Sequence, residues 1–315
     1  MNHEKVIAID HGNRNIKTPN KVFSAKCGET NHLPPMGRDV LVYNGREYTI
    51  DNRCPSRQLD KTKSDDYFIL TLFAVCKEVF ENTDYLTNIS LSEPIPVVIL
   101  AGLPLTHYRD NKAAFKKYLT ERENPICVEF NSHPLRINIK EVFVYPQAYA
   151  ASLTIADKIG SARTLGIVDI GGHTIDCLEL TNGIADIHTC TTFYKGVNFL
   201  FQGINEKVRA KLEKDMSEDA IETILKGENP DGYPTERITM IRETATEFVR
   251  LLLLDIAQTR LDVTNHQTLF VGGGATLLKE YIERDGTVAK PIFVENVHAN
   301  AYGYLLMYNM QATRA

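Results

Sequence analysis

The sequence lacks the features that mark several large classes of protein. None of its six cysteines belongs to a CxxC pair or stands at a zinc-ligand spacing from a histidine, so neither a zinc site nor a disulfide framework is expected. Widely scattered free cysteines fit a reduced cytoplasm. The longest uncharged apolar stretch, residues 95–105, is interrupted by prolines and a glycine and falls far short of the ~20 apolar residues that span a bilayer. We therefore expect no membrane contact.

An excess of positive charge is also missing. The chain has 35 Lys and Arg residues against 40 Asp and Glu residues, a net charge of −5, which argues against direct binding of nucleic acid. The N-terminus enters a strand-like segment at once, without the basic start and apolar core of a signal peptide. With 315 residues, 43% of them apolar, the chain has enough material for two domains with their own cores. These properties predict a cytoplasmic globular protein.

Residues 166–176, GIVDIGGHTID, form the motif around which the chain is organised. An aliphatic strand runs through Asp169, and Gly171 and Gly172 then allow a tight turn into a second strand. Because glycines have no Cβ, backbone N–H groups in such a turn approach phosphate oxygens closely, and a nearby carboxylate can hold a metal ion. The motif therefore predicts a phosphate and magnesium site, although a plain hairpin with an aspartate and a Gly-Gly turn is the favoured explanation when the motif is considered alone.

The same pattern occurs near the N-terminus. Residues 6–15, VIAIDHGNRN, again run from an aliphatic strand through an aspartate, Asp10, to a glycine, Gly12, and polar residues. Two copies indicate a pseudo-symmetric molecule with one phosphate loop in each half. A third glycine-rich loop, residues 269–275 (LFVGGGA), joins a buried strand to a helix whose N-terminus favours an anion.

In their order and spacing, these loops resemble the two phosphate motifs and the adenosine motif of the superfamily that contains actin, the heat-shock chaperone ATPases and the sugar kinases. The resemblance implies an α/β fold of two actin-like domains, each of the RNase H type, with a nucleotide cleft between them. It places domain I at residues 1–160 plus 298–315, with an inserted subdomain at about 20–60, and domain II at residues 161–297. Inside the insertion, Asn44-Gly45 separates two alternating apolar runs and predicts a hairpin.

Two further segments narrow the resemblance. Residues 102–108, GLPLTHY, and residues 299–303, ANAYG, resemble the corresponding segments of the plasmid-segregating actins of the ParM/StbA family. Membership would imply an ATPase that binds ATP with Mg²⁺, assembles head to tail with copies of itself into filaments, and hydrolyses ATP to destabilise them. Such filaments move plasmid copies apart through a DNA-binding adaptor protein.

Gln147 distinguishes the chemistries within the superfamily. Sugar kinases carry an acidic proton acceptor in this region, whereas actins and ParM-like proteins carry a Gln or Glu that orients the attacking water. An amide is a poor proton acceptor but orients water well, and phosphate transfer to water depends mainly on positioning. Gln147 is therefore the predicted catalytic residue, and a surface amide at a helix start is the alternative interpretation.

The resemblance also implies the other site residues. Asp10 and Asp169 would hold magnesium through waters, and the adenosine side would lie on Gly272, Gly273 and Gly274. Phosphate and nucleotide contacts are implied for a further group of residues: Gly12, Asn13, Lys17, Gly171, Gly172, His173 and Thr174. Lys17 would reach a phosphate as a point charge, and a solvated lysine is the alternative interpretation.

Three residues near these loops have less specific signals. Glu206, on a predicted helix, is expected near the base, although exposed charged residues on helices are more commonly solvated. Asp176 is expected to order the strand ends rather than to bind directly. His11 is expected to be a turn residue without a catalytic role.

Two other functions stay open. Residues 10–17, DHGNRNIK, are similar to the first phosphate loop of type III pantothenate kinases, but no acidic base for a small-molecule kinase can be placed near Gln147. A non-hydrolysing scaffold related to the cell-division actins would assemble without ATP turnover. The C-terminal segment shows no amphipathic membrane anchor, which argues against a membrane-bound scaffold.

Overall fold

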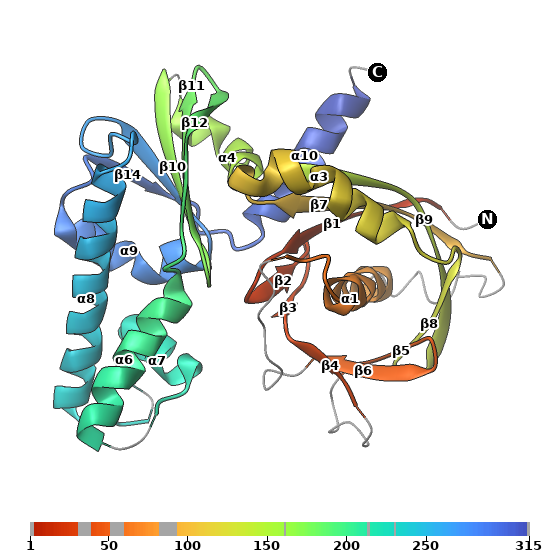
Figure 1. Cartoon of the computed structure of the whole chain (residues 1–315), viewed down its shortest axis with the longest axis horizontal. Coiled ribbons are helices and arrows are strands. Elements are labelled where there is room, and N and C mark those ends of the chain that lie inside the picture. Colours follow the sequence, from red (N-terminus) through yellow and green to blue (C-terminus); the bar gives the residue numbers. More distant parts are fainter. Residues whose placement is uncertain are drawn as a thin grey trace. The chain divides into compact units, whose positions relative to one another are not determined.

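The computed structural model describes residues 3–30, 39–50, 60–81, 93–160, 162–212, 215–229 and 231–313. The chain divides into two compact units (Figure 1). Unit 1 comprises Met1–Thr154 and His298–Ala315, and unit 2 comprises Ile155–Val297. The division after Thr154 comes slightly before the boundary expected at residue 160.

Unit 1 is built on a large sheet. The strands of its described residues are β1 (Lys5–His11), β2 (Asn15–Lys17), β3 (Val22–Ser24), β4 (Cys27–Glu29), β5 (Val40–Tyr43), β6 (Arg46–Ile50), β7 (Ile95–Leu103), β8 (Ile126–Phe130) and β9 (His133–Pro146). Among these residues they form one nine-stranded sheet in the order β3-β2-β1-β7-β9-β8-β5-β6-β4. β1, β7 and β9 are parallel neighbours, so their carboxyl ends meet at one edge of the sheet.

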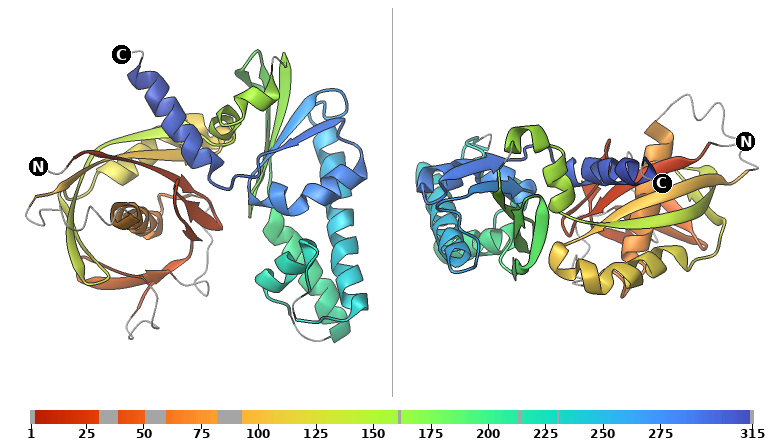
Figure 2. Two further views of the ribbon diagram at one scale, coloured as in Figure 1. Left: turned by 180° about the vertical axis from the view of Figure 1, so that it is seen from behind. Right: turned by 90° about the horizontal axis from the view of Figure 1, so that it is seen from above.

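Side-chain alternation along β1 separates two cores in unit 1. Ile7 and Ile9 pack with α1 (Asp66–Glu81), whereas Ala8 packs with residues of α10 (Ala299–Ala312). The ribbon shows these two helices on opposite faces of the sheet (Figure 2). The sheet curls around α1 in Figure 1, and buried side chains therefore occur on every side of that helix. α3 (Leu105–Thr120) contributes Phe115 to the α1 core, and the short α4 (Tyr149–Leu153) packs against α10.

The segment at about 20–60 does not form a subdomain of its own in the part that the structure describes. β4, β5 and β6 continue the main sheet, because β5 pairs with β8. The predicted hairpin is confirmed, since β5 and β6 are joined by Asn44 and Gly45 with φ angles of 51° and 73°. Residues 31–38 and 51–59 of the insertion lie outside the described residues.

Unit 2 repeats the central part of this arrangement on a smaller sheet. Its strands are β10 (Thr164–Ile170), β11 (Ile175–Thr181), β12 (Ile184–Phe193), β13 (Gln267–Val271) and β14 (Lys290–Phe293). Its helices are α5 (Ala156–Ile159), α6 (Val197–Leu212), α7 (Glu218–Leu225), α8 (Thr235–Ala257) and α9 (Gly273–Asp285). Within the described residues, α6, α7, α8 and α9 share one hydrophobic core with one face of this sheet.

The two units share a strand order. In unit 2 it is β12-β11-β10-β13-β14, and in unit 1 the corresponding part is β3-β2-β1-β7-β9. In each of these five-strand parts, the first three strands in sequence pair antiparallel, and the last two, β7 and β9 in unit 1 and β13 and β14 in unit 2, run parallel to the first. The duplication inferred from two short sequence motifs is therefore a duplication of topology. None of the helices in the described ranges has the length and apolar character needed to cross a membrane.

Candidate functional site

Asp10 lies near the carboxyl end of β1 and is held by three side chains of unit 1. Gln147 donates a hydrogen bond from Nε2 to Oδ1 of Asp10 at 2.7 Å, and Asn300 donates from Nδ2 to Oδ2 at 3.4 Å. Lys17, directly opposite Asp10 on β2, has its Nζ 3.8 Å from Oδ2. Because Asp10 is only 3% exposed, these contacts fix the direction of its carboxylate.

The turn after β1 requires a glycine. A Cβ on Gly12 would lie 2.5 Å from the backbone oxygen of Asn15, which is too close for any side chain. The neighbouring Asn13 accepts a hydrogen bond from the hydroxyl of Tyr67 on α1 at 3.0 Å through its Oδ1. The predicted contact of Asn13 with a ligand therefore depends on its amide nitrogen or its backbone.

His11 is a buried strand residue, and the expectation that it would be a turn residue is wrong. It ends β1 and points to the α1 side, where Nε2 bonds Oγ1 of Thr71 at 2.8 Å. Thr71 donates its own proton to the backbone oxygen of Tyr67, so Nε2 of His11 carries the hydrogen in this contact. Burial, and the nearby charge of Lys61, lower the pKa of His11 to about 3. Lys61 donates a hydrogen bond to the backbone oxygen of His11.

This neutral histidine makes the fold sensitive to acid. An unfolded chain binds a proton at His11 below its ordinary pKa of 6.5, while the folded chain does not until about pH 3, so stability falls as the pH drops through that window. Between pH 7 and pH 5, the wild type should lose about 2 kcal/mol of unfolding free energy that His11→Gln does not lose. Urea denaturation at both pH values measures the difference.

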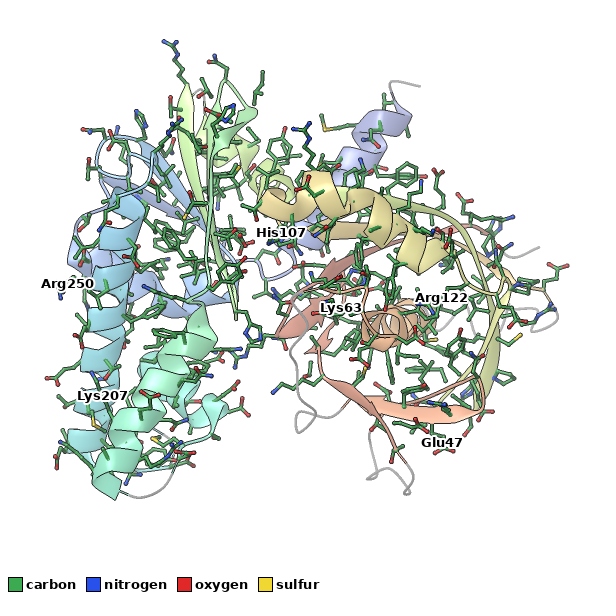
Figure 3. All side chains as sticks on the ribbon, viewed as in Figure 1. Glu47, Lys63, His107, Arg122, Lys207 and Arg250 are labelled. Atoms are coloured by element: carbon green, nitrogen blue, oxygen red, sulfur yellow. The ribbon has the colours of Figure 1, made fainter. Side chains whose placement is uncertain are left out.

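His107 provides the matched control for this measurement. It is exposed on α3 and is labelled in Figure 3. His107→Gln should keep the pH dependence of the wild type. Equal acid sensitivity of His11→Gln and the wild type would show that His11 does not stay neutral in the folded chain.

The loop after β10 repeats the geometry of the loop after β1. Asp169 lies opposite Asp176 across the β10–β11 pair, as Asp10 lies opposite Lys17. A Cβ on Gly171 would lie 3.0 Å from the backbone oxygen of Thr174, three residues further on. In the same way, a Cβ on Gly12 would lie close to the backbone oxygen of Asn15. In both turns the glycine therefore lies close to the backbone oxygen three residues further on.

The carbonyl groups of this second loop face the first turn of α6. Gly171 O accepts from Val197 N–H at 3.0 Å, and Gly172 O accepts from Asn198 N–H at 2.9 Å. The carbonyls satisfy N–H groups that a helix start otherwise leaves without a partner. With its carbonyls bonded to α6 and the Gly171 N–H bonded to Thr174 O at 2.9 Å, the loop is held in one backbone conformation. Glycine-rich turns of this kind suit an anion.

Gly196 makes this docking possible. A Cβ there would lie 2.6 Å from Gly171 O and 2.5 Å from Gly172 O. Gly196 also donates its own N–H to His173 O at 3.1 Å. The side chain of His173 bonds Asn198 at 3.3 Å. Gly196 was not among the predicted site residues, although a glycine directly before a helix is a signal for this close approach.

Asp176 orders the hydroxyl groups at the strand ends, as predicted. Thr174 donates from Oγ1 to Oδ2 of Asp176 at 3.2 Å, and Thr192 donates to Oδ1 at 2.5 Å. Asp176 is buried, whereas Asp169 is partly exposed. Asp169 is therefore the more accessible of the two carboxylates for a metal ion.

The three glycines after β13 have different structural roles. Gly272 has φ 94°, and a Cβ there would lie 2.5 Å from Oδ1 of Asp169. Gly274 packs against β10, since a Cβ would lie 2.5 Å from Cγ2 of Ile170. Among the described residues, a Cβ on Gly273 would meet no atom within 4 Å. Gly273, at the N-terminus of α9, is thus the glycine that the fold itself does not require.

Glu206 is exposed on α6, more than two turns from the start of that helix. Its neighbour Lys207, labelled in Figure 3, forms an ion pair with Glu247 of α8 at 3.3 Å. The predicted contact of Glu206 with a base stays a prediction. Within the described residues, no three His, Cys, Asp or Glu side chains gather in a way that could hold a metal ion by themselves.

Sequence comparisons assign both halves of the chain. Residues 8–149 match the N-terminal domain of actin-like proteins, and residues 167–284 match the C-terminal domain of archaeal MreB-like actin homologues. The chain therefore belongs to the actin-like proteins. No curated protein matches the sequence significantly.

Solved structures with the same fold cover nearly the whole chain. The archaeal actin homologue Ta0583 in complex with ADP is 18% identical with a TM-score of 0.74, and the match covers 99% of this chain and 100% of that one. A subunit of a 15-stranded ParM filament from Clostridium botulinum is 18% identical with a TM-score of 0.74, covering 98% and 100%. The AlfA filament bound to AMPPNP is 14% identical with a TM-score of 0.63, covering 99% of each chain. The predicted actin-like fold, shared with ParM, is confirmed.

Proposed function

We propose that this protein is a cytoplasmic ATPase that binds ATP with Mg²⁺ and assembles with copies of itself into filaments. The observation that carries the proposal is the repeated strand-end aspartate followed by a glycine turn, at the same topological position in both units. One copy of this arrangement is a common hairpin. Two copies, together with the glycine-rich start of α9, match the requirements of a nucleotide with a phosphate tail and a metal.

The residues of unit 2 fit a nucleotide. The carbonyls of Gly171 and Gly172 are bonded to the start of α6, which fixes the backbone of the 171–174 loop, and a Cβ on Gly273 would meet no atom of the described residues within 4 Å at the N-terminus of α9. Backbone N–H groups and the helix dipole both favour a phosphate. We assign the phosphates to Gly12, Gly171, Gly172 and Thr174 and the adenosine side to residues 272–274.

Magnesium fits the carboxylates that the structure describes. Mg²⁺ prefers oxygen ligands and commonly binds through one or two carboxylates, waters and the phosphates of a substrate, so no all-protein cluster is needed. Asp10 and Asp169 are the proposed carboxylates. When bound, Mg²⁺ neutralises charge that develops on the phosphates. Lys17, placed 3.8 Å from Asp10, supplies positive charge in unit 1.

Gln147 is the proposed residue that orients the attacking water. Its Nε2 donates to Asp10 at 2.7 Å, and its side chain is 8% exposed. In the described part of the chain, Oε1 of Gln147 has no hydrogen-bond partner. An amide oxygen held in this way accepts a hydrogen bond from water and fixes its direction without removing its proton.

Filament formation is supported by the relatives. Both the Clostridium botulinum ParM and AlfA structures are filaments, and AlfA carries AMPPNP. We extend this to plasmid segregation through a DNA-binding adaptor, with no direct contact between this chain and nucleic acid. The net charge of −5 agrees with an adaptor-mediated link to DNA.

Light scattering recorded together with phosphate release tests the proposed function. ATP and magnesium are added to the purified protein, with GTP and nucleotide-free samples as controls. A scattering rise that requires nucleotide and is accompanied by phosphate release supports a dynamic filament. Bound ATP with flat scattering at concentrations well above micromolar would contradict it, and phosphate transfer to a small molecule would then indicate a kinase.

Substitution of Gly273 distinguishes an effect on ligand binding from an effect on the stability of the fold. Gly273→Ala adds a methyl group where the protein offers open space, and alanine favours a helix over glycine by about 1 kcal/mol, so thermal stability should stay equal or rise. If adenosine lies on the start of α9, the same methyl group should weaken ATP binding about tenfold. Calorimetric titration with ATP measures this change.

Gly203 is the matched control, because a Cβ there also meets no atom of the described part of the chain within 4 Å and Gly203 lies in the middle of α6. Gly203→Ala should leave ATP affinity unchanged. Unchanged affinity in Gly273→Ala as well would remove residues 272–274 from the proposed adenosine site.

A further inference from the structure

The backbone next to Gln147 has an unusual conformation. Ala148 has φ 61° and ψ −50°, and Tyr149 donates its N–H to Gln147 O at 2.6 Å. These values define a γ-turn with positive φ, which is rare and strained for a residue that carries a Cβ. Such strain persists only where surrounding contacts hold it, and it often occurs at functional positions.

Asn300 supplies the contact that holds this turn. Its Oδ1 accepts the N–H of Ala148 at 2.9 Å, and its Nδ2 donates to Asp10 at 3.4 Å. Both ends of one buried amide are therefore used, one on the turn and one on the aspartate. Asn300 is 8% exposed, so each contact is shielded from water.

Close packing between α4 and α10 fixes the position of Asn300. Gly303 follows Asn300 by one helical turn, and a Cβ on Gly303 would lie 2.0 Å from the backbone oxygen of Ala150. The two helices therefore approach through their backbones. Asn300 is on the same side of α10 and reaches the turn that begins α4.

The other side of the turn is held by β7. Gln147 donates its N–H to Leu103 O at 2.8 Å. Gln147 is thus fixed by its own N–H on one side and by the turn at Ala148 on the other, and in this conformation its Nε2 bonds Asp10. If Ala148 relaxed to a negative φ, the peptide group between Gln147 and Ala148 would rotate.

We infer that Asn300 is a positioning residue that holds Ala148 in its strained turn and thereby directs Gln147 toward Asp10. The inference rests on the proposed hydrolysis, because it explains how Gln147 keeps the orientation needed for water. No local sequence pattern indicates this link, since Asn300 is far from Gln147 in the chain. Asn300 acts through Gln147 and does not itself contact the reacting atoms.

A cycle of variants at the two positions tests the inference, because glycine adopts positive φ readily and alanine does not. In Asn300→Ala, the strained Ala148 loses its support, and the rate of phosphate release should fall about tenfold with little change in ATP affinity. Ala148→Gly alone should keep the rate of the wild type. In the double variant, the glycine introduced by Ala148→Gly keeps the turn without help, and most of the lost rate should return.

Rescue by Ala148→Gly is the result that a general structural defect would not give. One contrary result is that Asn300→Ala slows phosphate release by the same factor in the wild type and in the Ala148→Gly variant. That result would show that Asn300 only supports the fold, and the inference would be wrong. An unchanged rate in Asn300→Ala also overturns it. Asn309→Ala, an exposed asparagine on the same helix, is the control and should behave as the wild type.

A second measurement does not depend on hydrolysis. The amide hydrogen of Tyr149, which is bonded in the turn, can be followed by exchange in the nucleotide-free protein. Its exchange should speed up about tenfold in Asn300→Ala and return toward the wild-type rate in the double variant. If the wild type hydrolyses no ATP, the proposed function fails, while the exchange rates still decide whether Asn300 holds the turn.

Discussion

Gln147→Ala should bind ATP and assemble as the wild type does, while it releases phosphate about 100-fold more slowly. The substitution removes the amide oxygen that orients water and also the hydrogen bond of 2.7 Å from Nε2 to Asp10. Asp10 keeps its contacts with Asn300 and Lys17, so its carboxylate stays in place for magnesium. Stopped-flow phosphate release, with scattering recorded on the same sample, separates assembly from hydrolysis.

Filaments of this variant should also persist longer after assembly, because hydrolysis is the step that destabilises them in the proposed cycle. Gln202→Ala, an exposed glutamine on α6, is the matched control and should change neither signal. Wild-type phosphate release from Gln147→Ala would remove Gln147 from the catalytic assignment. Loss of ATP binding would instead show that its main role is to hold Asp10.

Gly196→Ala should abolish measurable ATP binding at concentrations that saturate the wild type. The new Cβ would lie 2.5 Å and 2.6 Å from two backbone oxygens of the 171–174 loop, and backbone atoms cannot rotate away as a side chain does. Either the loop or the start of α6 must move, and the loop then loses the conformation that its hydrogen bonds to Val197 and Asn198 hold. The unfolding free energy should fall by about 1–3 kcal/mol, as is typical for an overpacked position.

Gly203→Ala, on the same helix, is the control for the general effect of replacing a glycine, as opposed to the close contact of a new Cβ with the 171–174 loop. Its Cβ meets nothing within 4 Å, so this variant should gain up to about 1 kcal/mol of stability and bind ATP normally. Calorimetry with ATP and urea denaturation on both variants measure the two effects. Normal ATP binding by Gly196→Ala would show that the ligand does not require this conformation of the loop.

Local patterns predicted the parts of the site that lie within one turn and its flanking strands. β1, β10 and the start of α9 each follow from an aliphatic run and a glycine close to it, and the structure places Asp10 and Asp169 at corresponding strand positions. The β5–β6 hairpin follows from Asn44-Gly45 for the same reason. These features depend on residues only a few positions apart.

The contacts that orient the site residues were not predictable in this way. Asn300 reaches Asp10 across 290 positions of sequence, and no local pattern encodes such a contact. The burial of His11, by contrast, could have been inferred. Along β1, Ile7, Ile9 and His11 share one face, so the residue after Asp10 belongs on the side of the larger apolar core.

The return of α10 to unit 1 affects the order in which a newly made chain can fold. A ribosome that adds about 5–20 residues per second completes the 290 positions between Asp10 and Asn300 in roughly 15 to 60 s. During that time Ala8 and the neighbouring residues of β7 lack the cover that Ala301 and Tyr304 provide. Unit 2, which is continuous in sequence, can fold earlier.

The ribosome must therefore synthesise α10 before Asp10 can bond all of its partners, because Asn300 is on that helix. A chain that stops before residue 299 lacks Asn300 and the packing of α10 on β1 and β7. Such fragments would lack contacts on which the proposed nucleotide site depends.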